Sequence, residues 1–150
     1  MKKIFFMGVM LLLCTISFGQ QMNPIQWSSA TEKISDTEMF LVFTATIQPN
    51  WHLYNLQIPE GGPLPTTFSI EKSKAIKYVG DVTPVSTPIK AHDNNFDMDL
   101  EYFSDKAVFK QKINIAKGIS TTVKASVNYM CCDDHQCIPP TEHKFVILVK

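Results

Sequence analysis

The chain has 150 residues, of which 45% are hydrophobic, and its 14 basic and 14 acidic residues give a formal net charge of zero. A chain of this length favours one domain with a buried core. Every cation is a lysine, and the lysines form no cluster that would follow a phosphate backbone. These features argue against nucleic acid as a partner.

The N-terminus has the pattern of a secretory signal peptide. A lysine pair is followed by the apolar run of residues 4–13 and by the small residues Ser17 and Gly19. The apolar run is well short of the roughly 20 residues that span a bilayer. We therefore expect cleavage after Gly19, with residues 1–19 as the signal peptide. Residues 20–150 are then expected to form one exported domain that does not span the membrane.

Alternation of apolar and polar residues predicts strands along the rest of the chain. In chain order they are residues 25–33, 39–48, 51–54, 67–71, 76–79, 107–115, 121–129 and 144–150. The pattern is clearest in the second strand and in the last three. Residues 90–102 are acidic and poor in strand pattern, so we expect a surface loop or an irregular hairpin there.

The order of these elements indicates the fold class. Gly and Pro turns separate the short strands, and no segment shows a sustained helical stripe. Such a sequence is typical of an all-β domain. The simplest arrangement is two antiparallel sheets packed as an immunoglobulin-like sandwich.

The most distinctive stretch is YMCCDDHQCIPP, residues 129–140. Cysteines of exported proteins meet an oxidising environment and can pair. Cys132 and Cys137 fall at the two ends of a four-residue turn that leads into the final strand, which favours a disulfide between them. A Cys131–Cys137 bond remains feasible if the turn is one residue longer. Asp133 is suited to an Asx turn between the strands.

Three chemistries fit this stretch. A structural disulfide that closes so short a loop contributes only roughly 2 kcal/mol, and a domain of this size already has room for a core. A metal site would use Cys132, His135 and Cys137 for copper(I) or zinc, but structural zinc sites normally draw ligands from two clusters. The third chemistry is thiol:disulfide exchange.

Two further features of the stretch bear on that choice. Pro139 and Pro140 lack amide protons, which predicts a strand edge or end after Cys137 and sulfur atoms near the surface. Asp133 and Asp134 disfavour a thiolate at Cys132. An oxidised pair in this setting still reacts with the activated thiolate of a partner, so the stretch suits an electron relay better than an independent oxidant.

The same stretch resembles the active loop of the N-terminal periplasmic domain of DsbD-type thiol:disulfide interchange proteins. The shared frame is Tyr-x-x-Cys followed by Cys-x-Pro-Pro. WHLY at residues 51–54, GPLPTTF at residues 62–68 and AVF at residues 107–109 are also similar to that family. The resemblance covers residues 23–150.

The resemblance implies a periplasmic protein thiol:disulfide oxidoreductase with an immunoglobulin-like fold and no cofactor. Cys132 and Cys137 match the family's redox pair, with Cys137 as the cysteine that attacks substrate and Cys132 as the one that resolves. Cys131 stands where the family does not require a cysteine. Phe96 is the candidate for the family's aromatic cap over the disulfide.

The resemblance also implies the surroundings and the partners of this pair. His52, Tyr54 and Tyr129 are expected to wall the site. The family's membrane domain and thioredoxin-like domain do not follow in this sequence, which leads us to expect a separate membrane-embedded or thioredoxin-like reductant. The expected electron acceptors are oxidised periplasmic thiol proteins.

Overall fold

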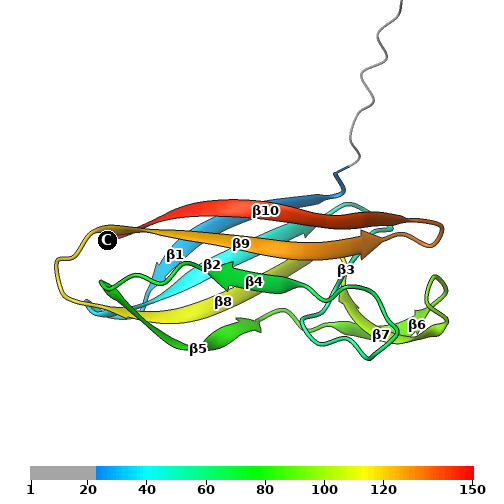
Figure 1. Ribbon diagram of the computed structural model, residues 1–150, viewed down its shortest axis with the longest axis horizontal. Helices are drawn as coiled ribbons and strands as arrows, with labels where there is room; N and C mark the ends of the chain where they lie inside the picture. Colours follow the sequence, from blue (N-terminus) through cyan, green and yellow to red (C-terminus); the bar gives the residue numbers. More distant parts are fainter. Residues whose placement is uncertain (1–22) are drawn as a thin grey trace, which may run out of the picture.

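A computed structural model describes residues 23–150, so the predicted signal peptide lies outside the described residues. This part of the chain forms ten strands and no helix (Figure 1). The strands are β1 (Ile25–Lys33), β2 (Glu38–Ile47), β3 (His52–Tyr54), β4 (Thr67–Ile70), β5 (Ile76–Pro84), β6 (Ile89–Asp93), β7 (Met98–Phe103), β8 (Lys106–Ile115), β9 (Thr121–Cys132) and β10 (Cys137–Val149). The predicted all-β class and most of the predicted strands are thereby confirmed.

The strands form two antiparallel sheets that pack as an immunoglobulin-like sandwich. One sheet has four strands in the order β1-β2-β8-β5. The other has six, in the order β10-β9-β3-β7-β6, with β4 paired to β9 beside this path. No helix long and apolar enough to cross a membrane occurs within residues 23–150.

The core between the sheets follows from the period-two pattern of the central strands. In β2, Leu41, Phe43 and Ala45 are fully buried, and the residues between them are half-buried. In β9, Val123 and Val127 face the same core, as the alternation of that strand predicts. Aromatic rings fill the centre of the core. The centre of the Phe68 ring lies 4.9 Å from that of Phe43 and 5.1 Å from that of Phe109.

The segment at residues 90–102 is a hairpin, which was one of the two expected arrangements, but its strands are regular and not irregular. β6 and β7 pair without interruption from Ile89↔Tyr102 to Asp93↔Met98. The charged residues that suggested a loop alternate along β7 with apolar ones, so that Asp99 and Glu101 face solvent while Leu100 is buried. The strand signal was hidden by carboxylates on the outer face of a short hairpin.

Several connections meet at one end of the sandwich. The turn between β9 and β10, the β6–β7 hairpin and the short strand β3 lie together there, and the C-terminus lies at the opposite end (Figure 1). β3 pairs with β9 on one side and with β7 on the other. β3 therefore joins the end of β9 to the β6–β7 hairpin.

Candidate redox site

A disulfide closes the turn between β9 and β10. Cys132 is the last residue of β9 and Cys137 is the first of β10, and the two are cross-strand partners with Cα atoms 4.0 Å apart. Their sulfur atoms are bonded at 2.02 Å. The favoured Cys132–Cys137 pairing is confirmed, and the Cys131–Cys137 alternative is wrong because Cys131 is a free, buried thiol.

The four residues inside the disulfide form the predicted Asx turn. The Asp133 carboxylate accepts hydrogen bonds from the backbone N–H groups of His135 at 2.8 Å and Gln136 at 2.7 Å. The backbone N–H of Asp133 donates to the Gln136 carbonyl at 2.9 Å. The hydrogen bond from the His135 N–H, supported by the one from Gln136, holds the pKa of Asp133 below its ordinary value.

The two prolines act on β10 as expected. The pairing of β10 with β9 shifts register between Ile138 and Thr141, so Pro139 and Pro140 fall in an irregular segment where the ladder needs no amide protons from them. β10 is also an edge strand of its sheet. The absence of two donors is therefore tolerated beside the disulfide.

The expectation that both sulfur atoms lie near the surface is wrong for Cys132. Cys132 is 0% exposed, whereas Cys137 is half-buried. The reason is that β9 is an interior strand at this point, since His52 of β3 pairs with Cys132 on the side opposite β10. The disulfide is thus accessible mainly through Cys137.

A small hydrophobic cluster, separate from the main core, surrounds the disulfide. Its buried members are Tyr54, Leu100 and Cys132. Half-buried side chains pack against them, namely Ile58, Phe96, Met98, Tyr102, Met130 and Cys137. β3, β7 and the ends of β9 and β10 supply most of this cluster, so the disulfide lies in a pocket of apolar side chains at the end of the sandwich.

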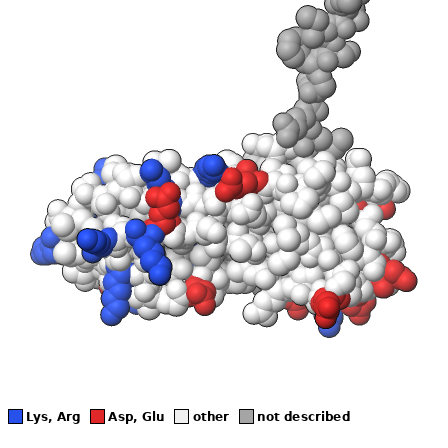
Figure 2. Space-filling model, in the orientation of Figure 1, with Lys and Arg blue, Asp and Glu red and all other residues white. Residues whose placement is uncertain are grey.

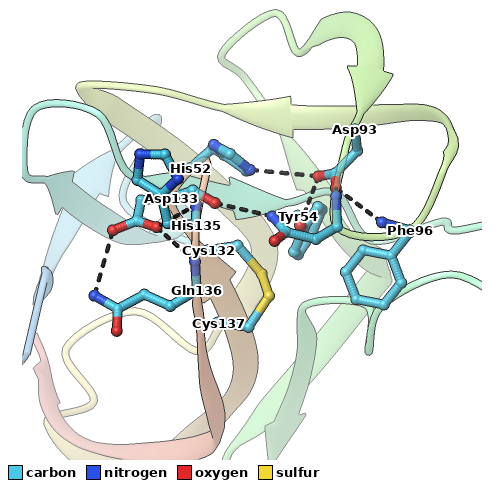
Figure 3. Close-up of a disulfide and its surroundings, with 10 residues drawn as sticks. His52, Tyr54, Asp93, Phe96, Cys132, Asp133, His135, Gln136 and Cys137 are labelled. Atoms are coloured by element: carbon cyan, nitrogen blue, oxygen red, sulfur yellow. Dashed lines mark hydrogen bonds and ion pairs between the residues drawn. A yellow bond between two sulfur atoms is a disulfide. The ribbon is translucent and has the colours of Figure 1, made fainter.

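Phe96 lies on the four-residue turn 94–97 between β6 and β7, which we call the cap turn. Its ring meets the Tyr54 ring edge-on at 5.9 Å and packs against the cluster that contains both cysteines (Figure 3). The backbone N–H groups of Asn95 and Phe96 donate to Asp93 Oδ1 at 2.9 and 3.3 Å. Phe96 therefore lies in the same cluster as the redox pair, and its role as a cap stays a prediction.

Asp93 is a buried carboxylate that the sequence did not single out. Its Oδ2 accepts a hydrogen bond from the Tyr54 hydroxyl at 2.7 Å and lies 3.4 Å from His52 Nε2, without hydrogen-bond geometry at the histidine (Figure 3). Burial, together with the Asp93 carboxylate, raises the pKa of Tyr54. Asp93 thus links Tyr54 of β3 to the backbone of the cap turn. The sequence signal was an Asp two residues before an Asn in a turn, which indicates an Asx turn but not its distant partner.

The expected wall residues divide into two groups. His52 and Tyr54 both lie at the site, where the His52 ring also packs at 4.5 Å against the ring of Tyr102. Tyr129 does not line the disulfide, because its side chain lies in the main core 5.6 Å from the Trp27 ring. The pleat of β9 directs Tyr129 and Cys131 to the face opposite Cys132.

Two residues of the stretch remain, namely Cys131, the third cysteine, and His135, a candidate metal ligand. Cys131 is 1% exposed, and burial raises its pKa to about 12. His135 is exposed on the turn. In this oxidised form Cys132 and Cys137 are bonded to each other, and no group of three or more His, Cys, Asp or Glu side chains in residues 23–150 is arranged to hold a metal ion.

Comparison with known proteins gives the following matches. The model of the family described as thiol:disulfide interchange protein DsbD, N-terminal, matches residues 21–148. The structure is similar to the N-terminal domain of DsbD from Neisseria meningitidis in the reduced form, with 15% identity, a TM-score of 0.52, and coverage of 83% of this chain and 84% of that one. It is also similar to the N-terminal periplasmic domain of ScsB from Proteus mirabilis, with 15% identity, a TM-score of 0.61, and coverage of 85% and 47%. No curated protein sequence matches the chain.

Proposed function

The chain belongs to the family of N-terminal domains of DsbD thiol:disulfide interchange proteins, and from this premise we propose that it relays electrons through the Cys132–Cys137 pair. The observation that carries the proposal is the asymmetric burial of this disulfide. Cys132 is fully buried in an apolar cluster, and Cys137 is half-buried beside Phe96. A purely structural disulfide does not need one partly exposed cysteine next to a turn that carries an aromatic side chain.

The first half of the proposed cycle reduces the domain. A thiolate of the reductant attacks Sγ of Cys137 and forms an intermolecular disulfide, while the bond to Cys132 breaks and its electron pair passes to Cys132 Sγ, which takes up a proton. A second thiol of the reductant then displaces Cys137 from that intermolecular disulfide. The domain leaves as a dithiol and the reductant as a disulfide, so two electrons have moved.

The second half returns the domain to the disulfide. The Cys137 thiolate attacks a disulfide of an oxidised partner, and Cys132 then attacks Cys137 in the mixed disulfide and releases the partner as a dithiol. Cys137 serves as the attacking sulfur because it is the more exposed of the two. Phe96 acts as a cap that must move aside before a partner reaches Cys137. His52 and Tyr54 form the wall of the site next to the disulfide.

The proposed partners follow from this cycle. A membrane-embedded or thioredoxin-like protein is the reductant, and oxidised periplasmic thiol proteins are the acceptors. Cleavage of residues 1–19 as a signal peptide brings the domain to the periplasm. The support for these statements is the family membership and the signal pattern in the sequence.

A redox titration of the purified domain, residues 20–150, tests the proposal. We expect the Cys132–Cys137 pair to equilibrate with a thiol buffer at a reduction potential less negative than about −300 mV, because a relay must both accept and donate electrons. Thiol trapping followed by intact mass measures the fraction reduced. The Cys131→Ala variant serves as the matched control, since it leaves the redox pair as the only trappable thiols. A potential far below that value indicates a permanent structural disulfide and contradicts the proposal.

A further inference from the structure

Two turns of the same local design face each other at the redox site. In the cap turn, the Asp93 carboxylate accepts the backbone N–H groups of Asn95 and Phe96. In the turn inside the disulfide, the Asp133 carboxylate accepts those of His135 and Gln136. Each turn is thus held in shape by one aspartate at its start, which is Asp93 at the end of β6 for the cap turn and Asp133 for the turn inside the disulfide.

One side-chain hydrogen bond joins these two turns. The Asn95 side-chain amide donates from Nδ2 to the backbone carbonyl of Asp133 at 2.9 Å, across 38 positions of sequence. Asn95 immediately precedes Phe96, and Asp133 immediately follows Cys132. The bond therefore ties the residue before the cap aromatic to the residue after the buried cysteine.

We propose that Asn95 is a positioning residue that latches the cap turn to the cysteine turn and so sets how often Cys137 becomes accessible. The inference rests on the proposed function, because it concerns access to the same disulfide. Asn95 acts through Phe96 and touches neither sulfur in the mechanism. The latch depends on the carboxamide, since an aspartate at position 95 has no N–H to donate.

The strength of this contact suits a latch that opens in each cycle. The hydrogen bond is exposed, so water competes for both of its partners when the turns separate. The cap turn is also held by the packing of Phe96 against Tyr54 of β3, by the hydrogen bonds of its backbone to Asp93 and by the exposed contact of Asp97 with His92 at 3.3 Å. Loss of one such hydrogen bond changes an opening equilibrium by about twofold to tenfold.

Reduction of the oxidised domain by excess dithiothreitol tests the latch. We expect Asn95→Ala to raise the pseudo-first-order rate by about twofold to tenfold, because the rate follows the population of the open cap turn. Asn95→Asp should raise it at least as much. Asn94→Ala is the matched control, because Asn94 is exposed on the same turn and makes no side-chain hydrogen bond among the described residues. Its rate should equal that of the unmodified domain.

A double-mutant cycle separates the latch from general loosening of the fold. Phe96→Ala by itself should speed reduction, and Asn95→Ala added to it should have no further effect, since no cap is left to position. An unchanged rate in Asn95→Ala, or full additivity with Phe96→Ala, would overturn the latch. The redox potential of the pair is measured in a separate experiment. If Asn95 has no effect on the rate, the latch is wrong but the electron-relay proposal is not affected. If the electron-relay proposal is wrong, the potential shows it and these rate ratios do not.

Discussion

At the scale of single residues, Cys131 and Cys132 are neighbours in the chain with opposite environments. Side chains of adjacent strand residues point to opposite faces, so Cys131 enters the main core with Tyr129 while Cys132 enters the cluster with Tyr54. This alternation explains why only Cys132 can reach Cys137 across the ladder. It also makes Cys131 an unreactive thiol despite its position next to a disulfide.

The raised pKa of Cys131 predicts a loss of stability at alkaline pH. In the unfolded chain the thiol ionises near 9.0, whereas in the folded protein it keeps its proton to about 12. The unfolded state therefore binds fewer protons in this window, and the free energy of unfolding falls as pH rises from about 9 toward about 12. In Cys131→Ala the decrease between pH 8 and pH 10 should be smaller by about 1 kcal/mol.

Urea denaturation at the two pH values measures this difference. Ionisation of the buried tyrosines, whose pKa values are also raised by burial, contributes a similar slope to both proteins, because the Cys131 thiolate that would further raise these pKa values does not form in the folded state between pH 8 and pH 10. Equal slopes in the two proteins would show that Cys131 ionises at its ordinary pKa in the folded state.

At the scale of elements, the four-stranded sheet supplies core residues, whereas the six-stranded sheet supplies both core residues and the redox site. β2 and β8 are regular strands whose inner faces supply the core, and they contribute no side chain to the cluster around the disulfide. β9 belongs to both regions, because its first part faces the core and its last residue carries a cysteine of the site. The short strand β3 and the β6–β7 hairpin complete the site around that last residue.

A pair of phenylalanines on β2 and β8 tests this division. Phe109 is 0% exposed and contacts the Phe68 and Phe103 rings, so Phe109→Ala should lower the free energy of unfolding by about 3–5 kcal/mol. Phe40, on the outer face of the same sheet, is half-buried beneath the Lys110 ammonium, and Phe40→Ala should cost much less. Urea denaturation measures both, and similar losses would contradict the assigned faces.

At the scale of the whole molecule, the charges are unevenly distributed. On the face drawn in Figure 2, acidic side chains predominate at the end that carries the redox site, and lysines predominate toward the other end. The exposed carboxylates of the site end include Glu60, Asp97, Asp99, Glu101 and Asp134. No lysine pairs with them among the ion pairs of residues 23–150, although His92 lies 3.3 Å from Asp97 and 3.6 Å from Asp99.

This distribution predicts that the disulfide discriminates between small thiols by charge. The thiolate of 2-mercaptoethanesulfonate carries two negative charges and is repelled by the acidic end, so added salt should speed its reaction several-fold as the repulsion is screened. The thiolate of cysteamine has no net charge, and its rate should change little. Replacement of Asp97, Asp99 and Asp134 by Asn should flatten the salt dependence.

Asp36→Asn is the matched control for that experiment, because Asp36 pairs with Lys33 and Lys117 away from the site. Its salt dependence should equal that of the unmodified domain. The same salt response for both thiols would show that the acidic end has no influence on reactions of the disulfide.

The local pattern of the sequence was sufficient for much of this structure. The fold class and the clear strands follow from alternation and turn residues, which depend only on near neighbours in the chain. The Cys132–Cys137 pair, the Asx turn at Asp133 and the edge position of the two prolines lie within one hairpin. Their geometry was therefore predictable from short spacings.

Other features were decided only by the tertiary structure. The hydrogen bond between Tyr54 and Asp93 spans 39 positions and the one between Asn95 and Asp133 spans 38, and no short-range pattern specifies either. The burial of Cys132 depends on β3 pairing with the end of β9, and the core position of Tyr129 depends on the face that it occupies there. The sequence by itself favoured a disulfide in a β-hairpin at residues 129–140, because neighbouring residues set that geometry. Which sulfur is reachable, and which turn covers it, were decided by contacts between segments far apart in the chain.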